Sequence, residues 1–143
     1  GLPSLADDSG LCVDALNGMP GVLSARWSGR KVRRRARTTA TTSCCWPSSR
    51  TSPDERRTAH FMCAVAFVHA GGEECASGTM PGRVIRECRG SGGFGYDVLF
   101  VADDRPGLTT AELSVADKDA ISHRGWALRR MAPIVAHLLA QAG

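Results

Sequence analysis

The sequence lacks the features that mark membrane and secreted proteins. Its 143 residues contain no apolar run of about 18 or more residues, so we expect no membrane-spanning helix. The first ten residues have no basic start followed by an apolar stretch, so they do not resemble a signal peptide. Hydrophobic residues make up 43% of the chain and charged residues 22%, which predicts one soluble globular domain in the cytoplasm. The chain does not begin with methionine, so we expect it to start within a longer protein.

The six cysteines lack the spacing of a zinc site or of a disulfide framework. Four of them stand singly, and no C-x-x-C pair occurs; the four are Cys12, Cys63, Cys75 and Cys88. Because no secretion signal accompanies them, we expect buried, reduced thiols rather than metal ligands.

The net charge of +4 comes from one short segment. Residues 30–37 carry six basic residues, so without them the net charge would be 4 − 6 = −2. A basic nucleic-acid-binding module would rest on this segment alone. We therefore expect neither nucleic acid nor a membrane as a partner.

Residues 31–52 read unlike their surroundings and show neither helical nor strand periodicity. A disordered linker is one explanation, and a one-base frameshift in the gene is the one that we favour. Read from the last base of each codon, Cys44, Cys45 and Trp46 followed by Pro47 give Leu, Leu and Ala, and the neighbouring codons permit a helix with an apolar face. Under this hypothesis the basic segment carries no function.

The remaining apolar patterns predict strands in the middle of the chain and a helix at its end, and hence an α/β or α+β class. We expect strands over residues 3–7, 11–16, 60–69, 74–79 and 98–101. The near-continuous apolar run at 60–69 predicts a central strand buried on both faces. Asn17-Gly18 and Pro81-Gly82 predict turns.

Two helices are expected in the last third. Ser114 followed by Asp117 resembles a capping box at the start of a short helix. Residues 125–142 predict a longer amphipathic helix. Its expected apolar stripe consists of Leu128, Met131, Val135, Leu138 and Leu139.

Two adjacent carboxylates, Asp7 and Asp8, stand where the first predicted strand meets a polar loop. Carboxylates in such a place can hold a hard cation and orient a water for attack on phosphorus. Ser9 and the flexible Gly10 would let hydroxyl and backbone donors approach an anion. An ordinary acidic loop explains the same residues.

A glycine-rich stretch, GSGGFGYD, occupies residues 90–97. Glycines bring backbone N–H groups close to a ligand, and Phe94 or Tyr96 offers a ring on which a base can stack. Asp97 could accept hydrogen bonds from a purine edge. The stretch matches neither the P-loop nor the dinucleotide-binding pattern, and a glycine-rich hairpin with core aromatics is the alternative.

A third group of polar residues comprises Lys118, His123 and Arg124. Lysine can neutralise phosphate as a point charge, arginine can bind an oxygen acceptor through two N–H groups, and His123 could donate to a base carbonyl. A capped helix start with a solvated lysine and arginine explains the same sequence.

In this order, the three groups resemble the inosine triphosphate pyrophosphatase family, which acts on non-standard purine nucleoside triphosphates. The matching stretches are residues 2–29, 90–100 and 111–128. The resemblance implies an α/β fold in which an elongated mixed β-sheet with flanking helices forms a cleft between two lobes, usually in a homodimer. It further implies Mg²⁺-dependent hydrolysis of ITP, dITP or XTP to the monophosphate and pyrophosphate, which keeps these nucleotides out of nucleic acid.

The resemblance also assigns roles to individual residues. Asp8 matches the general base and a metal ligand, with Asp7 supporting the metal. Ser9 matches a substrate contact, and Phe94 matches the ring that stacks on the purine. The other substrate-binding residues that it implies are Gly95, Tyr96, Asp97, Lys118, His123 and Arg124. A hydrogen-bond donor placed at the 6-position can bond the oxo group of hypoxanthine or xanthine. Opposite the amino group of adenine, the same donor would be left without an acceptor.

The sequence departs from the family pattern in three respects. Val98 stands where the family has proline, and Asp119 stands where it often has asparagine. The family's N-terminal part, with a phosphate loop and an acidic metal ligand, lies outside this sequence. We therefore expect little activity from the isolated chain, and the alternative is a catalytically incompetent remnant that at most binds nucleotide.

Overall fold

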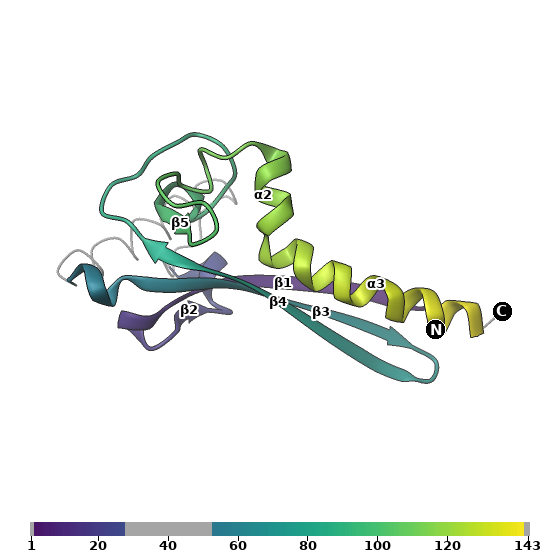
Figure 1. The fold of residues 1–143 in the computed structure, drawn as a ribbon. Coiled ribbons are helices and arrows are strands. Elements are labelled where there is room, and N and C mark those ends of the chain that lie inside the picture. The colour runs from purple at the N-terminus through teal and green to yellow at the C-terminus, as the bar shows by residue number, and fades with distance from the viewer. Residues whose placement is uncertain (1, 28–52, 142–143) are drawn as a thin grey trace.

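A computed structural model describes residues 2–27 and 53–141 (Figure 1). The segment 31–52, with the proposed frameshift and the basic patch, lies outside the described residues. One five-stranded sheet of order β2-β1-β3-β4-β5 organises the described chain. Its strands are β1 (Ser4–Val13), β2 (Met19–Gly21), β3 (Thr58–His69), β4 (Gly72–Val84) and β5 (Phe100–Ala102).

The α/β class with flanking helices is confirmed. Each of the four strand pairings among the described residues is antiparallel, so the parallel pairs of a mixed sheet do not occur within this part of the chain. Helix α2 (Val115–Ile121) leads into the long helix α3 (His123–Gln141), which lies along the β3–β4 hairpin (Figure 1). None of the described helices is long and apolar enough to cross a membrane.

Strand β1 continues through the residues expected to form a polar loop. Asp7, Asp8 and Ser9 pair one-to-one with residues of β3, so the backbone stays extended where acidic residues suggested a loop. The expected second strand at 11–16 is instead the end of β1, followed by a 3-10 turn at Asp14–Leu16. The Asn17-Gly18 turn is confirmed, with Asn17 at a φ of 52°.

Strand β3 exists as predicted but is buried on only one face. Its burial alternates along the strand, with Cys63 and Val65 fully buried but Met62 41% and Val68 51% exposed. The prediction of burial on both faces was wrong because the described helices cover a single side of the sheet.

Strand β4 runs straight through the Pro81-Gly82 pair, where a turn was predicted. A side chain at Gly82 would clash with the Val101 carbonyl, so this glycine serves close packing of β5 rather than a turn. The strand expected at 98–101 begins later, at Phe100, after a 3-10 turn at Asp97–Leu99.

The Ser114 cap is confirmed, because its hydroxyl accepts a hydrogen bond from the Asp117 amide at 3.1 Å. The stripe on α3 is only partly as predicted, since Leu128 and Leu139 are exposed. The residues that pack on the sheet are Ala127, Met131, Ile134, Val135 and Leu138. A small residue, Ala127, faces the strands where the helix backbone comes closest.

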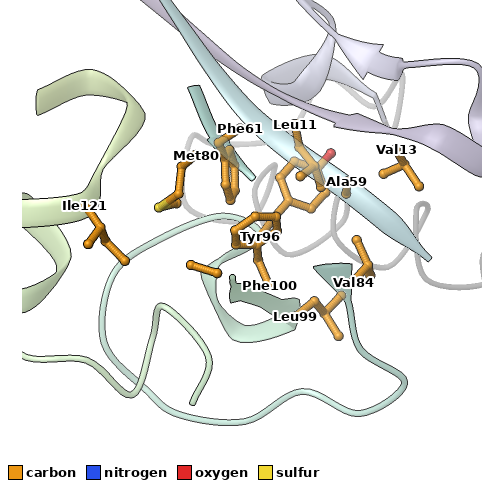
Figure 2. Close-up of a cluster of buried hydrophobic side chains, with 11 residues drawn as sticks. Leu11, Val13, Ala59, Phe61, Met80, Val84, Tyr96, Leu99, Phe100 and Ile121 are labelled. Atoms are coloured by element: carbon orange, nitrogen blue, oxygen red, sulfur yellow. The ribbon is translucent and has the colours of Figure 1, made fainter. Parts of the chain in front are cut away.

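A second apolar cluster fills the space between the sheet and the loops that precede α2. Phe61, Met80, Tyr96, Leu99 and Phe100 form its centre (Figure 2). The rings of Phe61 and Phe100 meet edge to face, with centroids 4.7 Å apart. This cluster fixes the loop at 90–97 and the start of α3 against the same face of the sheet.

The cysteine prediction is only partly correct. All four described cysteines are free thiols, but only Cys63 is buried, while Cys75 and Cys88 are exposed. Burial raises the pKa of Cys63 above its ordinary value, so the thiol stays protonated at neutral pH.

Candidate functional site

Asp97 is the hub of the glycine-rich loop. Its side chain is buried and its carboxylate accepts three hydrogen bonds, from the Phe94 amide at 2.7 Å, the Thr110 hydroxyl at 2.8 Å and the Lys118 ammonium at 2.6 Å. Gly93 makes this closure possible, because a Cβ there would lie 2.1 Å from the Asp97 carboxylate. The carboxylate therefore faces inward and holds the loop together.

Phe94 is the exposed aromatic residue of the same loop. Its side chain is 80% exposed, although its own amide is tied to Asp97. The Lys118 ammonium lies 5.3 Å from the centre of the Phe94 ring, a cation–π distance. An exposed ring on an anchored backbone is a suitable platform for stacking a flat ligand.

Tyr96 does not share this exposure. It is 6% exposed and its hydroxyl donates to the Ser24 carbonyl at 3.1 Å, so it points into the core (Figure 2). Gly95 adopts a φ of 68°, which lets the chain turn between the exposed Phe94 and the buried Tyr96. We interpret Tyr96 as the residue that anchors the loop.

His123, at the start of α3, stacks on Phe61 with ring centroids 5.0 Å apart. Burial lowers its pKa from 6.5 to about 4, while Asp97 works in the opposite direction, so the imidazole is neutral at pH 7. Its Nδ1 is buried and has no hydrogen-bond partner within the described part of the chain. A buried, unpaired N–H is costly, which favours the tautomer with the proton on Nε2.

Arg124 forms an ion pair with Asp7, with 2.8 Å between Nη2 and Oδ1. The two residues lie 117 positions apart, so this contact joins β1 to the start of α3. The other Asp7 oxygen lies 3.9 Å from the Cys63 thiol. Asp7 thus belongs to the side of the sheet that α3 covers.

Asp8 points to the opposite side. Successive side chains of a strand alternate between faces, so Asp7 and Ser9 share the face of Cys63 while Asp8 projects from the other. Asp8 is exposed, and its Oδ1 accepts a hydrogen bond from the Ser9 amide at 2.9 Å. Among the described strands, none pairs with β1 over residues 4–10 on its outer edge.

The structure therefore gathers the predicted residues into two groups. The first group lies on the face that α3 covers and contains three contacts. Phe94 and Asp97 contact Lys118, His123 stacks on Phe61, and Arg124 pairs with Asp7. Asp8 stands apart on the other face. A ligand that contacted both groups would cross the edge of β1 at residues 4–10, with which no other described strand than β3 pairs.

The carboxylates fit a divalent cation in one way only. No three His, Cys, Asp or Glu side chains within residues 2–27 and 53–141 come together as a metal site. Asp7 is engaged by Arg124, whereas the exposed Asp8 carboxylate is accessible. Mg²⁺ commonly uses one or two carboxylates together with substrate phosphates and waters. Of these two carboxylates, Asp8 is therefore the one that fits such a cation.

Sequence reasoning missed three residues that hold the site. Phe61 supplies the stack under His123, Thr110 bonds Asp97, and Gly78 lets α3 approach β4. An isolated glycine in an apolar strand can indicate close backbone approach, so Gly78 carried a signal. Nothing in the local sequence distinguishes Thr110 from Thr109 beside it.

Comparison with known proteins gives a consistent match. The sequence pattern of the Ham1 family matches residues 1–134. A dITP/XTP pyrophosphatase of Mycolicibacterium paratuberculosis is 58% identical over 133 residues, which cover 93% of this chain and 63% of that protein. A dITP/XTP pyrophosphatase of Cutibacterium acnes is 53% identical over 141 residues and is covered to 67%. The chain thus spans about two thirds of the length of these relatives, and slightly less for the first.

Solved structures show the same likeness. A HAM1 protein from Coxiella burnetii superimposes with a TM-score of 0.83 at 35% identity, over 95% of this chain and 68% of that one. A nucleoside-triphosphatase / dITP/XTP pyrophosphatase from Mycobacterium abscessus gives a TM-score of 0.76 at 48% identity, over 94% and 66% of the two chains. The described part of the chain therefore shares its fold with these proteins.

Proposed function

This chain belongs to the Ham1 family, and we propose that it hydrolyses non-standard purine nucleoside triphosphates such as ITP, dITP and XTP to the monophosphate and pyrophosphate. The observation that carries the proposal is the grouping of Phe94, Lys118 and His123 on one face of the sheet. A stacking ring, an ammonium and a neutral imidazole together suit a flat, electron-rich base that carries a phosphate chain.

The neutral imidazole supports selection for a 6-oxo group. His123 can present an Nε2–H donor, because its buried Nδ1 lacks a partner among the described residues. Such a donor pairs with the carbonyl of hypoxanthine or xanthine. Adenine places an amino donor at the same position, which would leave two donors facing each other.

The phosphate chain would cross the edge of β1. Arg124, held by Asp7, lies on the face of the base site, and Asp8 lies on the far face. We assign Asp7 to the orientation of Arg124 and Ser9 to a substrate contact between the two groups. Within the described residues, metal binding falls to Asp8.

In the proposed reaction Asp8 acts as the general base. A water would attack the α-phosphorus while the Asp8 carboxylate accepts its proton, and the bond from the α-phosphorus to the bridging oxygen breaks to release pyrophosphate. Mg²⁺ held by Asp8 and the substrate would offset negative charge on the phosphates. The Mg²⁺ requirement, a homodimeric state and a cytoplasmic location are parts of this proposal that rest on family membership.

Comparison of the wild-type chain with Asp8→Asn tests the proposal. Because the chain spans about two thirds of the length of its relatives, we expect the wild type to convert dITP only slowly, into equal amounts of dIMP and pyrophosphate measured by anion-exchange chromatography. Asp8→Asn should bind dIMP as the wild type does but turn over at least about a hundredfold more slowly, because it has lost its general base. Release of orthophosphate, or full activity of the variant, would contradict the proposal. Binding without turnover by the wild type would favour the alternative of a chain that only binds nucleotide.

A further inference from the structure

Thr110 is a buried residue whose hydroxyl bonds Asp97 on the side away from solvent. The residue is 1% exposed, and its amide donates to the Phe100 carbonyl at 2.8 Å. Its hydroxyl donates to Asp97 Oδ1 at 2.8 Å and also lies 3.3 Å from the Asp97 carbonyl. Thr110 is thus fixed by the sheet and in turn fixes one carboxylate oxygen.

The second carboxylate oxygen of Asp97 bonds the two residues on the solvent side, Phe94 and Lys118. Oδ2 accepts from the Phe94 amide and from the Lys118 ammonium. With Oδ1 bound to Thr110, the carboxylate cannot rotate about its own axis without breaking a buried hydrogen bond. The position of the Lys118 ammonium over the Phe94 ring therefore depends on a hydroxyl that touches neither residue.

We propose that Thr110 is a positioning residue that acts through Asp97 on Lys118 and on the Phe94 loop. Asp97 accordingly orients the lysine instead of contacting the purine edge, because its carboxylate is buried and already accepts three hydrogen bonds. The consequence for nucleotide binding rests on the proposed function, whereas the placement of Lys118 can be tested without any nucleotide.

Three variants isolate the hydroxyl. Thr110→Val removes it while keeping the shape of the side chain, and Thr110→Ser retains it. Thr109→Val is the matched control: Thr109 is equally buried, but its hydroxyl donates to the Arg89 carbonyl at 2.9 Å rather than to Asp97. All three are compared by thermal unfolding, so that a general loss of stability is recognised.

The chain contains only two lysines, Lys31 and Lys118, so a Lys31→Arg background leaves a single lysine side-chain ammonium to observe. An ammonium held by hydrogen bonds exchanges its protons slowly and gives a proton–nitrogen NMR signal. We expect this signal for wild type, Thr110→Ser and Thr109→Val, and its loss or broadening in Thr110→Val.

Calorimetric titration with IMP in EDTA measures the consequence for binding. Thr110→Val should weaken IMP about tenfold, the effect of one buried hydrogen bond to a charged group. Thr110→Ser and Thr109→Val should stay within about twofold of wild type. Because part of its effect passes through Lys118, the Thr110→Val substitution should weaken IMP binding less in a Lys118→Met background than in the wild type.

Two results would overturn the inference. One is an unchanged Lys118 signal in a folded Thr110→Val chain, and the other is an equal loss of signal in Thr109→Val. If no variant binds IMP, including wild type, the proposed function fails while the Lys118 signal still decides the role of Thr110. If Thr110→Val does not fold, Thr110→Ala and Thr110→Ser are compared in the same way.

Discussion

Substitution of Gly78 by alanine probes the contact that places His123. Gly78 lies in β4 under the first turn of α3, and a Cβ there would lie 2.2 Å from the His123 carbonyl oxygen and 2.6 Å from the Ala127 amide. Both atoms belong to the helix backbone, so no side-chain rotation can relieve the clash. The backbone angles at Gly78 are otherwise open to alanine, since its φ is not in the left-handed region.

The magnitude follows from these distances. To restore an ordinary contact the helix must move away by roughly 1 Å, which separates packed atoms along α3. Overpacking of this kind costs about 1–3 kcal/mol, so Gly78→Ala should lower the melting temperature by about 3–10 °C. The displacement should also weaken the stack of His123 on Phe61 and with it the affinity for IMP.

Circular dichroism during thermal unfolding measures the stability, and the His123 ring signals in NMR report the stack. Gly71→Ala is the control, because a Cβ there meets only the His69 ring, at 3.2 Å, and this ring can turn aside. The control should remain within about 0.5 kcal/mol of wild type. An alanine at position 78 that leaves both the melting temperature and the His123 signals unchanged would refute the reasoning.

Three further predictions concern single side chains. Tyr96→Phe should lower the free energy of unfolding in urea by about 1–2 kcal/mol, because the Ser24 carbonyl loses a buried donor. The affinity for IMP should stay unchanged, and a large loss of affinity would indicate that Tyr96 contacts the substrate. The lowered pKa of His123, about 4 against 6.5 unfolded, means that only the unfolded chain takes up a proton there between these values. Wild type should therefore lose stability relative to His123→Gln as the pH falls from 6.5 to 4, by up to about 3 kcal/mol, and a constant difference would contradict this. Asp7→Asn should weaken IMP binding in EDTA, because Arg124 loses the carboxylate that holds it. The affinity for Mn²⁺, measured by electron paramagnetic resonance, should stay unchanged. Weaker Mn²⁺ binding would indicate that Asp7 is a metal ligand.

Much of the fold could be predicted from local patterns. The strand predicted at 60–69, the capped start of α2 and the position of α3 each follow from an apolar pattern or from one hydrogen-bonding residue. The errors arose where tertiary contacts overrode local preference. Asp7 and Asp8 are poor strand residues, but pairing with β3 keeps them extended, and Gly82 serves packing against β5.

The site residues could be named from the sequence, but their orientation could not. Tyr96 and Phe94 are two positions apart in one loop, and only the fold shows that the first is buried and the second exposed. Asp7 and Asp8 point in opposite directions because both lie in β1, whereas the sequence predicted a loop there. The Asp7–Arg124 pair spans most of the chain, so no local pattern could reveal it.

Selectivity at the 6-position of the purine is the sharpest test of the proposed activity. The wild-type chain is incubated with Mg²⁺ and equal concentrations of dITP, XTP and dATP, and monophosphate and pyrophosphate are quantified over time. The geometry of His123 and Phe94 predicts that dITP and XTP are consumed while dATP persists, with at least about a hundredfold difference in rate. Equal consumption of all three, or hydrolysis of dATP alone, would contradict the account.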